Sequence, residues 1–385
     1  MSAVPQKLEI YRTALPMRRF EHAAAQRDLA EAVVVRLECS DGRSGWGETL
    51  PRPYVTGESI QSVISDLQEI LWPRLAGRQI DWDNTYEFIP RVAPGGRCLN
   101  AAACALDVAV LPWFLEFVHK QGLAPVRQDA RGRPTRQIAP RVSGVLGSSD
   151  PGRTARQLRL MRWYGLRHFK LKLGLGDDID QENLRLVHKA IGKGIAADRY
   201  SLRVDVNGAW KADEAPQRID QLKGLGVSLV EQPVYCSAGE FTQLARKCRL
   251  PLMADESLLT YEDAKTLADA PEWTWWNIRI SKNGGFIPAW LLGAMAREKG
   301  VPFVLGCMVG ESSILSAAQR RLLESGYAPR YVEGNYGRFL LGDDLTKHSL
   351  RFGYGGRLRP LEGEGLGVEV DPAKLARYAQ RVASL

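Results

Sequence analysis

The stretch His168-Phe169-Lys170-Leu171-Lys172-Leu173-Gly174 alternates apolar and basic residues and ends in glycine. That pattern is typical of a buried strand that stops at a turn. A helical spacing of apolar residues follows from Gln181 to Ile191. One strand followed by one amphipathic helix is the unit from which parallel sheets are built, because the helix carries the chain back to the start of the next strand.

The same unit recurs on both sides of this stretch. A first helix is expected from Pro151 to Gly165, and an amphipathic helix is expected after each later strand up to the seventh. Residues 334–344, which follow the eighth strand, do not have a helical pattern. The sequence therefore predicts an α/β protein built on a modified (β/α)₇β barrel of the TIM type. The expected strands are Ile138–Val145, His168–Leu173, Leu202–Val206, Leu229–Gln232, Leu252–Ala254, Asn277–Ile280, Phe303–Cys307 and Pro329–Glu333.

The residues outside this repeat predict a second, smaller domain. Residues 8–50 favour antiparallel strands, with a β-branched run at Ala32–Cys39 and a hairpin signal at Asp41-Gly42. Helical spacing follows in Ile60–Leu75 and Asn100–Phe117. We expect an α+β capping domain over residues 1–137 that ends in a polar linker at 127–137, and a barrel over 138–348. The tail, 349–385, has a strand–turn–strand pattern and is expected to return to the capping domain.

Composition limits the function classes. The chain of 385 residues is 45% hydrophobic and 25% charged, as is usual for globular proteins. No apolar run is long enough to span a membrane, and the N-terminus lacks a signal-peptide layout, so a cytoplasmic protein without a membrane partner is expected. The net charge of +8 is spread along the chain, which argues against a nucleic-acid partner. Six widely spaced cysteines predict buried, reduced thiols.

Ionisable residues stand at the ends of successive predicted strands. Lys172, Asp205, Glu231, Asp255 and Lys282 lie 24 to 33 residues apart, close to one strand–helix unit. Because active sites of such barrels gather at the carboxyl ends of the strands, these five side chains should converge on one rim. Each alone could be a helix cap or a surface charge. Their regular spacing makes the shared site the better interpretation.

The residue types fit one chemistry. The three carboxylates are oxygen ligands of the kind that Mg²⁺, or Mn²⁺ in its place, prefers. A bound cation would hold a substrate carboxylate and neutralise the enediolate formed when its α-carbon loses a proton. Lys172 and Lys282 lie on the second and sixth strands, hence on opposite sides of the mouth, as two bases for proton transfer would. Lys170 shares the strand face of Lys172, and its charge would lower the pKa of Lys172. Asn207 is a further candidate at this rim.

At these residues the sequence resembles the enolase superfamily, and within it the muconate lactonizing enzyme subgroup, which is also described as mandelate racemase/muconate lactonizing enzyme-like. Further matching phrases are Gly45-Trp46-Gly47-Glu48, Ala105-Leu106-Asp107, Gly306-Cys307-Met308 and residues 365–371. The matching phrases of the barrel are Lys170-Leu171-Lys172-Leu173-Gly174, Arg203-Val204-Asp205-Val206-Asn207, Val230-Glu231-Gln232-Pro233, Ala254-Asp255-Glu256-Ser257 and Ser281-Lys282-Asn283-Gly284-Gly285.

The resemblance implies the same roles. Asp205, Glu231 and Asp255 would bind the metal, and Lys172 and Lys282 would be the acid/base pair. Mandelate racemase-type relatives use a histidine late in the barrel; none of the five histidines here lies near the end of the sixth or seventh strand. Enolase itself has a glutamate at the position of Lys172. Two loops of the capping domain, 15–26 and 50–58, would cover the barrel mouth. Their candidate substrate contacts are Arg18, Arg19, His22, Arg52 and Tyr54.

Two segments depart from the family pattern. Dipeptide epimerases of the subgroup have an Asp-x-Asp motif at the eighth strand that binds the substrate amine, where this chain has Glu333-Gly334-Asn335. Glu333 is a candidate for a similar contact. After the seventh strand, Glu311 comes one residue later than usual; it is either a pocket residue or a helix-start carboxylate. These departures leave the substrate open, because the fold alone does not determine it.

Three functions remain at this point. The leading one is a racemase, epimerase or cycloisomerase, an isomerase that acts on a small carboxylate such as an N-acylated or dipeptide-like amino acid. The second is a lyase, a syn-dehydratase of the o-succinylbenzoate synthase type, which would use the same residues to eliminate water. The third is a non-catalytic paralogue or a basic nucleic-acid-binding protein. A symmetric homo-oligomer is the ordinary expectation.

Overall fold

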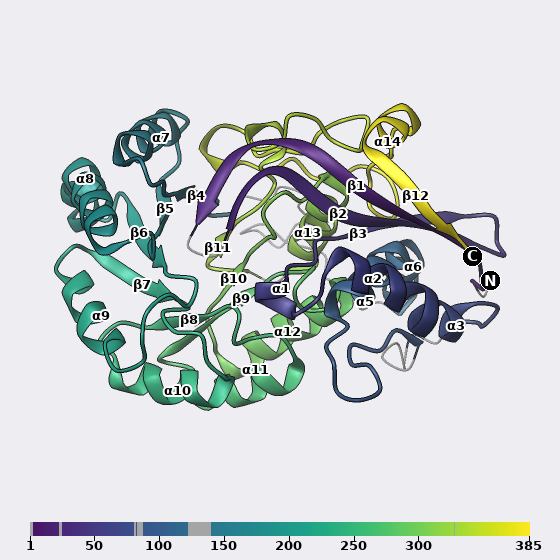
Figure 1. Ribbon diagram of the computed structural model, residues 1–385, viewed down its shortest axis with the longest axis horizontal. Helices are drawn as coiled ribbons and strands as arrows, with labels where there is room; N and C mark the ends of the chain where they lie inside the picture. Colours follow the sequence, from purple (N-terminus) through teal and green to yellow (C-terminus); the bar gives the residue numbers. More distant parts are fainter. Residues whose placement is uncertain (1–2, 23–24, 81, 83–87, 122–139, 327) are drawn as a thin grey trace.

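The protein consists of a barrel and a capping domain that lies against its mouth (Figure 1). A computed structural model describes residues 3–22, 25–80, 82, 88–121, 140–326 and 328–385, and the side chains of 19–27 are not described. The expected linker at 127–137 and the boundary between residues 137 and 138 lie outside the described residues. Those two limits therefore stay predictions.

The barrel is one sheet of eight strands in the order β11-β10-β9-β8-β7-β6-β5-β4, all parallel to their neighbours. A parallel bridge between Val142 and Val332 brings the last strand beside the first, so the sheet nearly closes. The α/β fold class is confirmed. The strands are β4 Ser143–Leu146, β5 His168–Lys172, β6 Ser201–Asp205, β7 Val227–Glu231, β8 Leu252–Ala254, β9 Thr274–Ile278, β10 Phe303–Leu305 and β11 Tyr331–Val332.

A helix follows each of the first seven strands, as the repeat predicts, and β11 is followed next by the short 3-10 turn η2, Gly337–Phe339. Local sequence explains several starts: Asp150, Ser237, Thr260 and Ser312 each accept a backbone N–H at a helix N-terminus. The helices are α7 Pro151–Trp163, α8 Asp177–Ala196, α9 Ala215–Lys223, α10 Ala238–Lys247, α11 Tyr261–Leu267, α12 Phe286–Lys299 and α13 Ser313–Glu324.

Several expected elements have other bounds or another pattern in the structure, among them the first strand and the helix after the sixth. The first strand begins at Ser143. Among the residues before it, 140 and 141 have no regular structure and Val142 forms a single bridge. The helix α12 is not amphipathic before Arg297: none of its residues up to that point is exposed. The reason is that α12 lies between the barrel strand β9 and the capping helix α5, Asn100–Ala109, and is covered on both sides.

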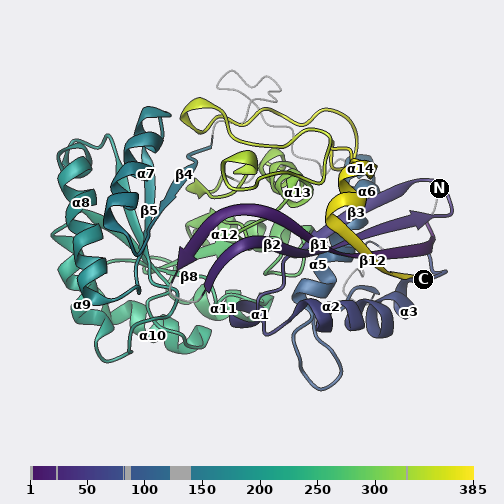
Figure 2. The same ribbon diagram turned by 45° about the horizontal axis from the view of Figure 1, so that its top comes forward.

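The capping domain is an antiparallel sheet in the order β12-β1-β2-β3 with helices against one face (Figure 2). Gly45 and Gly47 of β3 allow α5 to pack directly on the sheet, since a Cβ on either would lie within 2 Å of a carbonyl oxygen of α5. The strands are β1 Pro5–His22, β2 Ala25–Cys39, β3 Ser44–Thr49 and β12 Ala379–Ser384, and the helices are α1 Pro53–Thr56, α2 Ile60–Asp66, the π-helix η1 Leu67–Leu71, α3 Trp72–Leu75, α5 and α6 Leu111–Lys120.

The tail returns to the capping domain as expected, because β12 pairs with β1. Its local structure was predicted wrongly. Instead of strand–turn–strand it contains a 3-10 turn η3, Tyr354–Gly356, then helix α14, Pro372–Tyr378, and a single strand. The start of α14 is explained by Asp371, whose carboxylate accepts the N–H groups of Ala373 and Lys374, and by Pro372 at the first helical position.

All six cysteines are free; Cys39, Cys104 and Cys248 are buried and the other three are half-buried. No single described helix is long and apolar enough to cross a membrane. The bent pair α5 and α6, taken together, has the length and composition of a membrane span.

A buried carboxylate joins the two domains. The carboxylate of Asp107, on α5, binds the Arg91 guanidinium at 2.5 Å and accepts the N–H groups of Phe286 and Ile287 at the start of α12. We expect Asp107→Ala to lower the free energy of unfolding by about 3–5 kcal/mol, because Arg91 and two helix N–H groups lose their partner in a buried place. Urea denaturation measures this, with the exposed Asp213→Ala as control. A change below about 1 kcal/mol would contradict it.

Candidate active site

The ionisable residues that the sequence predicts at the strand ends converge in the structure at the carboxyl ends of the barrel strands. Lys172, Asp205 and Glu231 are the last residues of β5, β6 and β7, and they pair in register across the sheet. Asp255 directly follows β8. The three carboxylates have no exposed surface, so each needs a partner of opposite charge.

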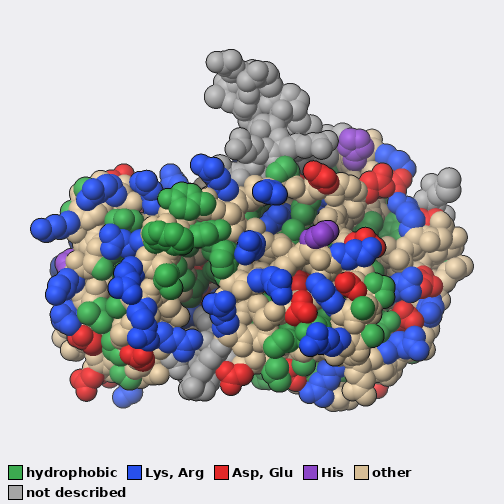
Figure 3. All heavy atoms as spheres, turned by 90° about the horizontal axis from the view of Figure 1, so that it is seen from above, with side chains coloured by type: hydrophobic (Ala, Val, Ile, Leu, Met, Phe, Trp, Pro, Cys, Tyr) green, Lys and Arg blue, Asp and Glu red, His purple; other side chains and the backbone are tan. Residues whose placement is uncertain are grey.

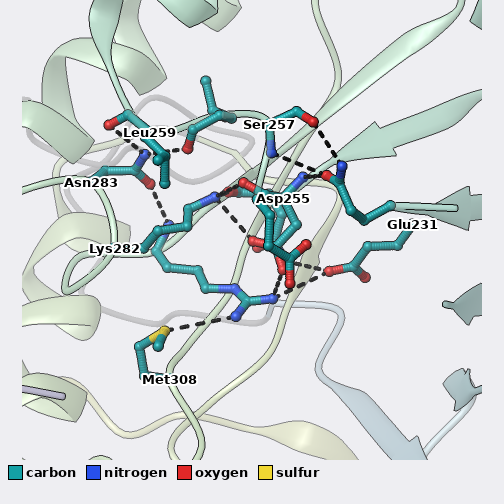
Figure 4. A network of polar contacts seen from close by, with 12 residues as sticks. Glu231, Asp255, Ser257, Leu259, Lys282, Asn283 and Met308 are labelled. Atoms are coloured by element: carbon teal, nitrogen blue, oxygen red, sulfur yellow. Dashed lines mark hydrogen bonds and ion pairs between the residues drawn. The ribbon is translucent and has the colours of Figure 1, made fainter. Parts of the chain in front are cut away.

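Buried cations alternate with these carboxylates. Lys170 Nζ lies 3.4 Å from Asp205 Oδ2 and 2.9 Å from Glu231 Oε2, so one ammonium bridges the first two. The Arg279 guanidinium bridges the next two, 3.4 Å from Glu231 Oε1 and in direct contact with Asp255 Oδ2. Figure 4 shows Glu231 and Asp255 beside each other in this network. Asp205, Glu231 and Asp255 thus form a row with Lys170 and Arg279 between them. The alternating charges hold this row together.

The neighbours shift the pKa values in this row. Burial alone would lower the pKa of Lys170, but the carboxylates of Glu231, Glu333 and Asp205 outweigh it and raise that pKa, so Lys170 stays charged. Burial raises the pKa of Asp205, yet Lys172 and Lys170 hold it below its usual range. The predicted lowering of the Lys172 pKa by Lys170 stays a prediction.

Lys172 lies at the open end of the row. Its ammonium is 2.7 Å from Asp205 Oδ2 and 2.8 Å from the side-chain oxygen of Asn207, and it lines the cavity. Asn207, a candidate from the sequence, thus orients this ammonium, and its own amide reaches Glu256 at 3.3 Å. Asn207 has a left-handed backbone, φ +48°, which asparagine tolerates better than most residues.

Lys282 was expected at the barrel mouth as one of two bases, but its ammonium is directed into the protein. Its ammonium donates to the backbone oxygens of Asp255 at 2.7 Å and Asn277 at 2.8 Å, and to Asp255 Oδ1 at 3.0 Å, and it is fully buried (Figure 4). The turn after β9 explains this, since Asn283 N–H and Gly285 N–H bond back to the oxygens of Arg279 and Ile280. Burial and the charge of Arg279 lower the pKa of Lys282.

A cavity of about 550 Å³ opens from the two lysines of β5 toward α7. Lys170, Lys172, Arg279 and Glu333 line its inner end, and Arg18 and Arg153 are the other charged residues in its wall. The rest of the wall is mainly apolar, and Figure 3 shows apolar side chains gathered beside a hollow on this face. The apolar wall includes Val145, Leu160, Met161, Trp163, Tyr164, Leu166, Val309, Phe339, Leu340 and Phe352.

Some of the predicted substrate contacts line the cavity and others do not. Arg18 lines the cavity, whereas Arg52 is buried and donates to the backbone oxygens of Glu31, Pro51 and Val309. Tyr54 is half-buried on α1 and is not part of the cavity wall. The side chains of Arg19 and His22 lie outside the described residues.

Glu333, at the eighth strand, points into the site but is already paired. Its carboxylate lies 2.5 Å from Lys170 Nζ and 2.8 Å from Arg203 Nη2. Arg203 was missed by the sequence reasoning, although it alternates with Asp205 on β6 and therefore shares its face. Arg279 was missed as well; it alternates with Asn277, whose amide binds Glu231 at 2.6 Å inside the barrel.

Glu311 closes the turn after β10 and is not among the residues that line the cavity. Its carboxyl accepts the backbone N–H of Met308 at 2.6 Å, and burial raises its pKa to about 8. The folded protein thus keeps a proton that the unfolded chain loses near pH 4.5, so this group lowers the free energy of unfolding as pH rises toward 8.

We expect Glu311→Gln to remove that loss, about 1.4 kcal/mol per pH unit between pH 5 and 8. Urea denaturation at several pH values measures the slope. An unchanged slope in the variant would show that Glu311 titrates normally.

The donor chemistry fits a divalent metal. Among the residues that the structure describes, no three His, Cys, Asp or Glu side chains form a ready cluster for an ion. The reason is visible in the row: cationic nitrogens stand between the carboxylates. Lys170 bridges Asp205 and Glu231, and Arg279 bridges Glu231 and Asp255. The three carboxylates supply hard oxygen atoms of the kind that a divalent metal cation prefers.

Comparison with known proteins agrees with the geometry. Residues 153–374 match the family model described as Enolase C-terminal domain-like. The chain is 28% identical over 317 residues to N-succinyl-L-Arg/Lys racemase of Bacillus cereus, which covers 81% of each chain. It is 30% identical over 343 residues to L-Lys-D/L-Arg epimerase of Methylococcus capsulatus, covering 87% of this chain and 90% of the relative.

Solved structures show the same fold. The crystal structure of the Bacillus cereus racemase aligns with a TM-score of 0.84 at 25% identity, over 100% of this chain and 99% of that one. The muconate lactonizing enzyme of Pseudomonas fluorescens, solved with muconolactone, aligns with a TM-score of 0.83 at 26% identity, over 99% and 100%. The barrel, the capping domain and these matches together show that the chain belongs to the enolase superfamily, in the mandelate racemase/muconate lactonizing enzyme subgroup.

Proposed function

We propose that the protein is a Mg²⁺-dependent enzyme that removes the α-proton of a small carboxylate substrate and forms an enediolate, with Lys172 as the base. The observation that carries this proposal is the position of Lys172. Its amine lines the cavity and at the same time contacts Asp205, the first carboxylate of the row. A base beside a metal-binding carboxylate can reach the carbon next to a bound carboxylate.

Asp205, Glu231 and Asp255 would hold the metal. When bound, Mg²⁺ supplies the positive charge that binds the substrate carboxylate and neutralises the charge developing on it. Asn207 holds the Lys172 amine in place at 2.8 Å. Lys170 and Arg279 keep the carboxylates apart from one another, and the apolar wall of the cavity excludes water from the reacting carbon.

An anionic substrate fits the charge of the site. The charged residues of the cavity wall are five cations and one carboxylate, Glu333, so the wall attracts an anion. Those cations are Arg18, Arg153, Lys170, Lys172 and Arg279. Glu333 is engaged by Lys170 and Arg203, which argues against the capture of a dipeptide amine at this position.

Removal of an α-proton begins several reactions. It is the first step of racemisation, epimerisation and cycloisomerisation, which we propose as the leading class. It is equally the first step of the runner-up, the syn-elimination of water. The large apolar part of the cavity favours a substrate with an apolar group beyond its carboxylate.

Incubation of the enzyme in D₂O with Mg²⁺ tests the proposal. The probes are N-succinyl amino acids, dipeptides, β-hydroxy acids and lactone acids, followed by NMR for loss of the α-proton. We expect exchange with at least one probe that stops on addition of EDTA and drops at least about 10²-fold in Asp205→Asn, while the Asp213→Asn control exchanges normally. Exchange that persists in EDTA would contradict the metal-dependent step.

A further inference from the structure

We propose that Arg279, and not Lys282, is the sixth-strand cation that faces the substrate, so that the reaction uses one base, Lys172, on one face of the reacting carbon. This inference rests on the proposed function and narrows it. It favours cycloisomerisation or syn-elimination over racemisation and epimerisation.

The placement of Lys282 is the first observation. Its three N–H groups have three acceptors within 3.0 Å, two of them backbone oxygens, and no part of the residue is exposed. Lys282 is not among the residues of the cavity wall. To reach a substrate, its amine would have to leave the backbone oxygens of Asp255 and Asn277 unpaired inside the protein, which is costly. Lys282 is therefore a positioning residue that fixes Asp255.

The placement of Arg279 is the second observation. Arg279 directly follows β9, and its guanidinium contacts Asp255 Oδ2, so the guanidinium reaches the buried carboxylates. It lines the cavity together with Lys170 and Lys172. Its Nη1 reaches only the Met308 sulfur, at 3.7 Å, and its Nε is buried without a hydrogen-bond partner among the described residues. An unsatisfied N–H beside the cavity is a donor available to a substrate oxygen.

The chemistry of the guanidinium determines which role Arg279 can have in the reaction. It has five N–H donors and no acceptor, so it binds and neutralises oxygen anions but does not take a proton from carbon. Inversion at the α-carbon needs one group that removes the proton and a second that delivers one to the opposite face. Lys172 provides the first, and Arg279, the cation at the end of the sixth barrel strand, does not provide the second.

Other side chains of the cavity do not supply the second base. Cys307 and Tyr336 line the wall, and burial raises the pKa of both well above its usual value, so they stay neutral. Lys170 lies within 3.4 Å of three carboxylates and Glu333 binds two cations, whereas Lys172 contacts a single carboxylate, Asp205. Among the described side chains, Lys172 is thus the one base placed to exchange a proton with the substrate.

One base is sufficient for elimination on one face. The C–H electron pair becomes the double bond of the enediolate while the proton moves to Lys172 Nζ. When the enediolate collapses, its electron pair forms the α,β double bond and the oxygen substituent on the β-carbon leaves. The Lys172 ammonium then returns the same proton to the leaving oxygen, releasing water, or the free acid when the leaving group is an ester oxygen of a lactone. The reverse sequence closes a lactone.

The test compares Arg279→Met with Lys282→Met in two measurements. In D₂O with Mg²⁺, we expect every probe acid that exchanges with the wild type to keep its configuration, as measured by chiral chromatography. Arg279→Met should lower this exchange at least about 10²-fold; with Mg²⁺ present its melting temperature should shift by less than about 3 °C, because the metal replaces the guanidinium charge between Glu231 and Asp255. Lys282→Met should lower the melting temperature by about 10 °C even with Mg²⁺ present, because the buried backbone oxygens of Asp255 and Asn277 lose their donor.

Each outcome decides the proposal. Inversion of configuration by the wild type would overturn it, as would a Lys282→Met enzyme that melts normally and has lost exchange. If no probe acid exchanges, the proposed function fails, while the melting temperatures still decide which residue is structural. If Lys282→Met does not fold at all, that result supports the structural assignment of Lys282, and unchanged melting of Arg279→Met completes it.

Discussion

Replacement of Lys172 by methionine is expected to lower α-proton exchange by about 10²–10⁴-fold, the usual contribution of a general base. Methionine keeps the length and apolar stem of lysine but has no amine. The fold should survive, because Lys172 is at the open end of the row. Its partner Asp205 still has the Lys170 ammonium 3.4 Å away as a counter-charge. Exchange is followed by NMR in D₂O, and Mn²⁺ binding is followed by EPR to show that the metal-binding carboxylates remain in place.

The matched control is Lys189→Met, an exposed lysine on α8. It should exchange at the rate of the wild type. If Lys172→Met retained near-wild-type exchange and bound Mn²⁺ normally, Lys172 could not be the base, and the proposed function would need another proton acceptor. A variant that lost both exchange and Mn²⁺ would instead show that Lys172 positions Asp205.

Replacement of Lys170 by methionine is expected to destabilise the protein strongly. Its ammonium lies within 3.4 Å of three buried carboxylates, those of Asp205, Glu231 and Glu333. Without it, these groups repel one another in a place with little solvent, which costs about 3–5 kcal/mol of the free energy of unfolding. Urea denaturation in EDTA measures the loss.

Two further measurements test the cause. Mg²⁺ should recover part of the stability of Lys170→Met, because a divalent cation can replace the missing charge between the carboxylates. The double variant Lys170→Met/Glu333→Gln should also be more stable than the single variant, since it removes one of the carboxylates left without its ammonium. If neither change restored stability, the loss would come from packing rather than from charge.

Much of the fold can be predicted from the sequence because the signals are local. The spacing of strands and helices follows from apolar periodicity, and the regular distance between Lys172, Asp205, Glu231 and Asp255 follows from the length of one strand–helix unit. A strand such as Leu252–Ala254 was therefore placed at its observed bounds. The tail could not be predicted in the same way, since β12 exists through its pairing with β1, more than 360 residues earlier in the chain.

The sequence by itself determined the family, the barrel and the group of carboxylates and lysines that the barrel gathers at one rim. Only the tertiary structure decided which of these side chains faces the cavity. Lys282 and Arg279 are three residues apart, and the direction of each depends on hydrogen bonds of the turn after β9, with partners from β8 and β9. Strand spacing carries no information about such bonds, because they join backbone groups brought together by folding.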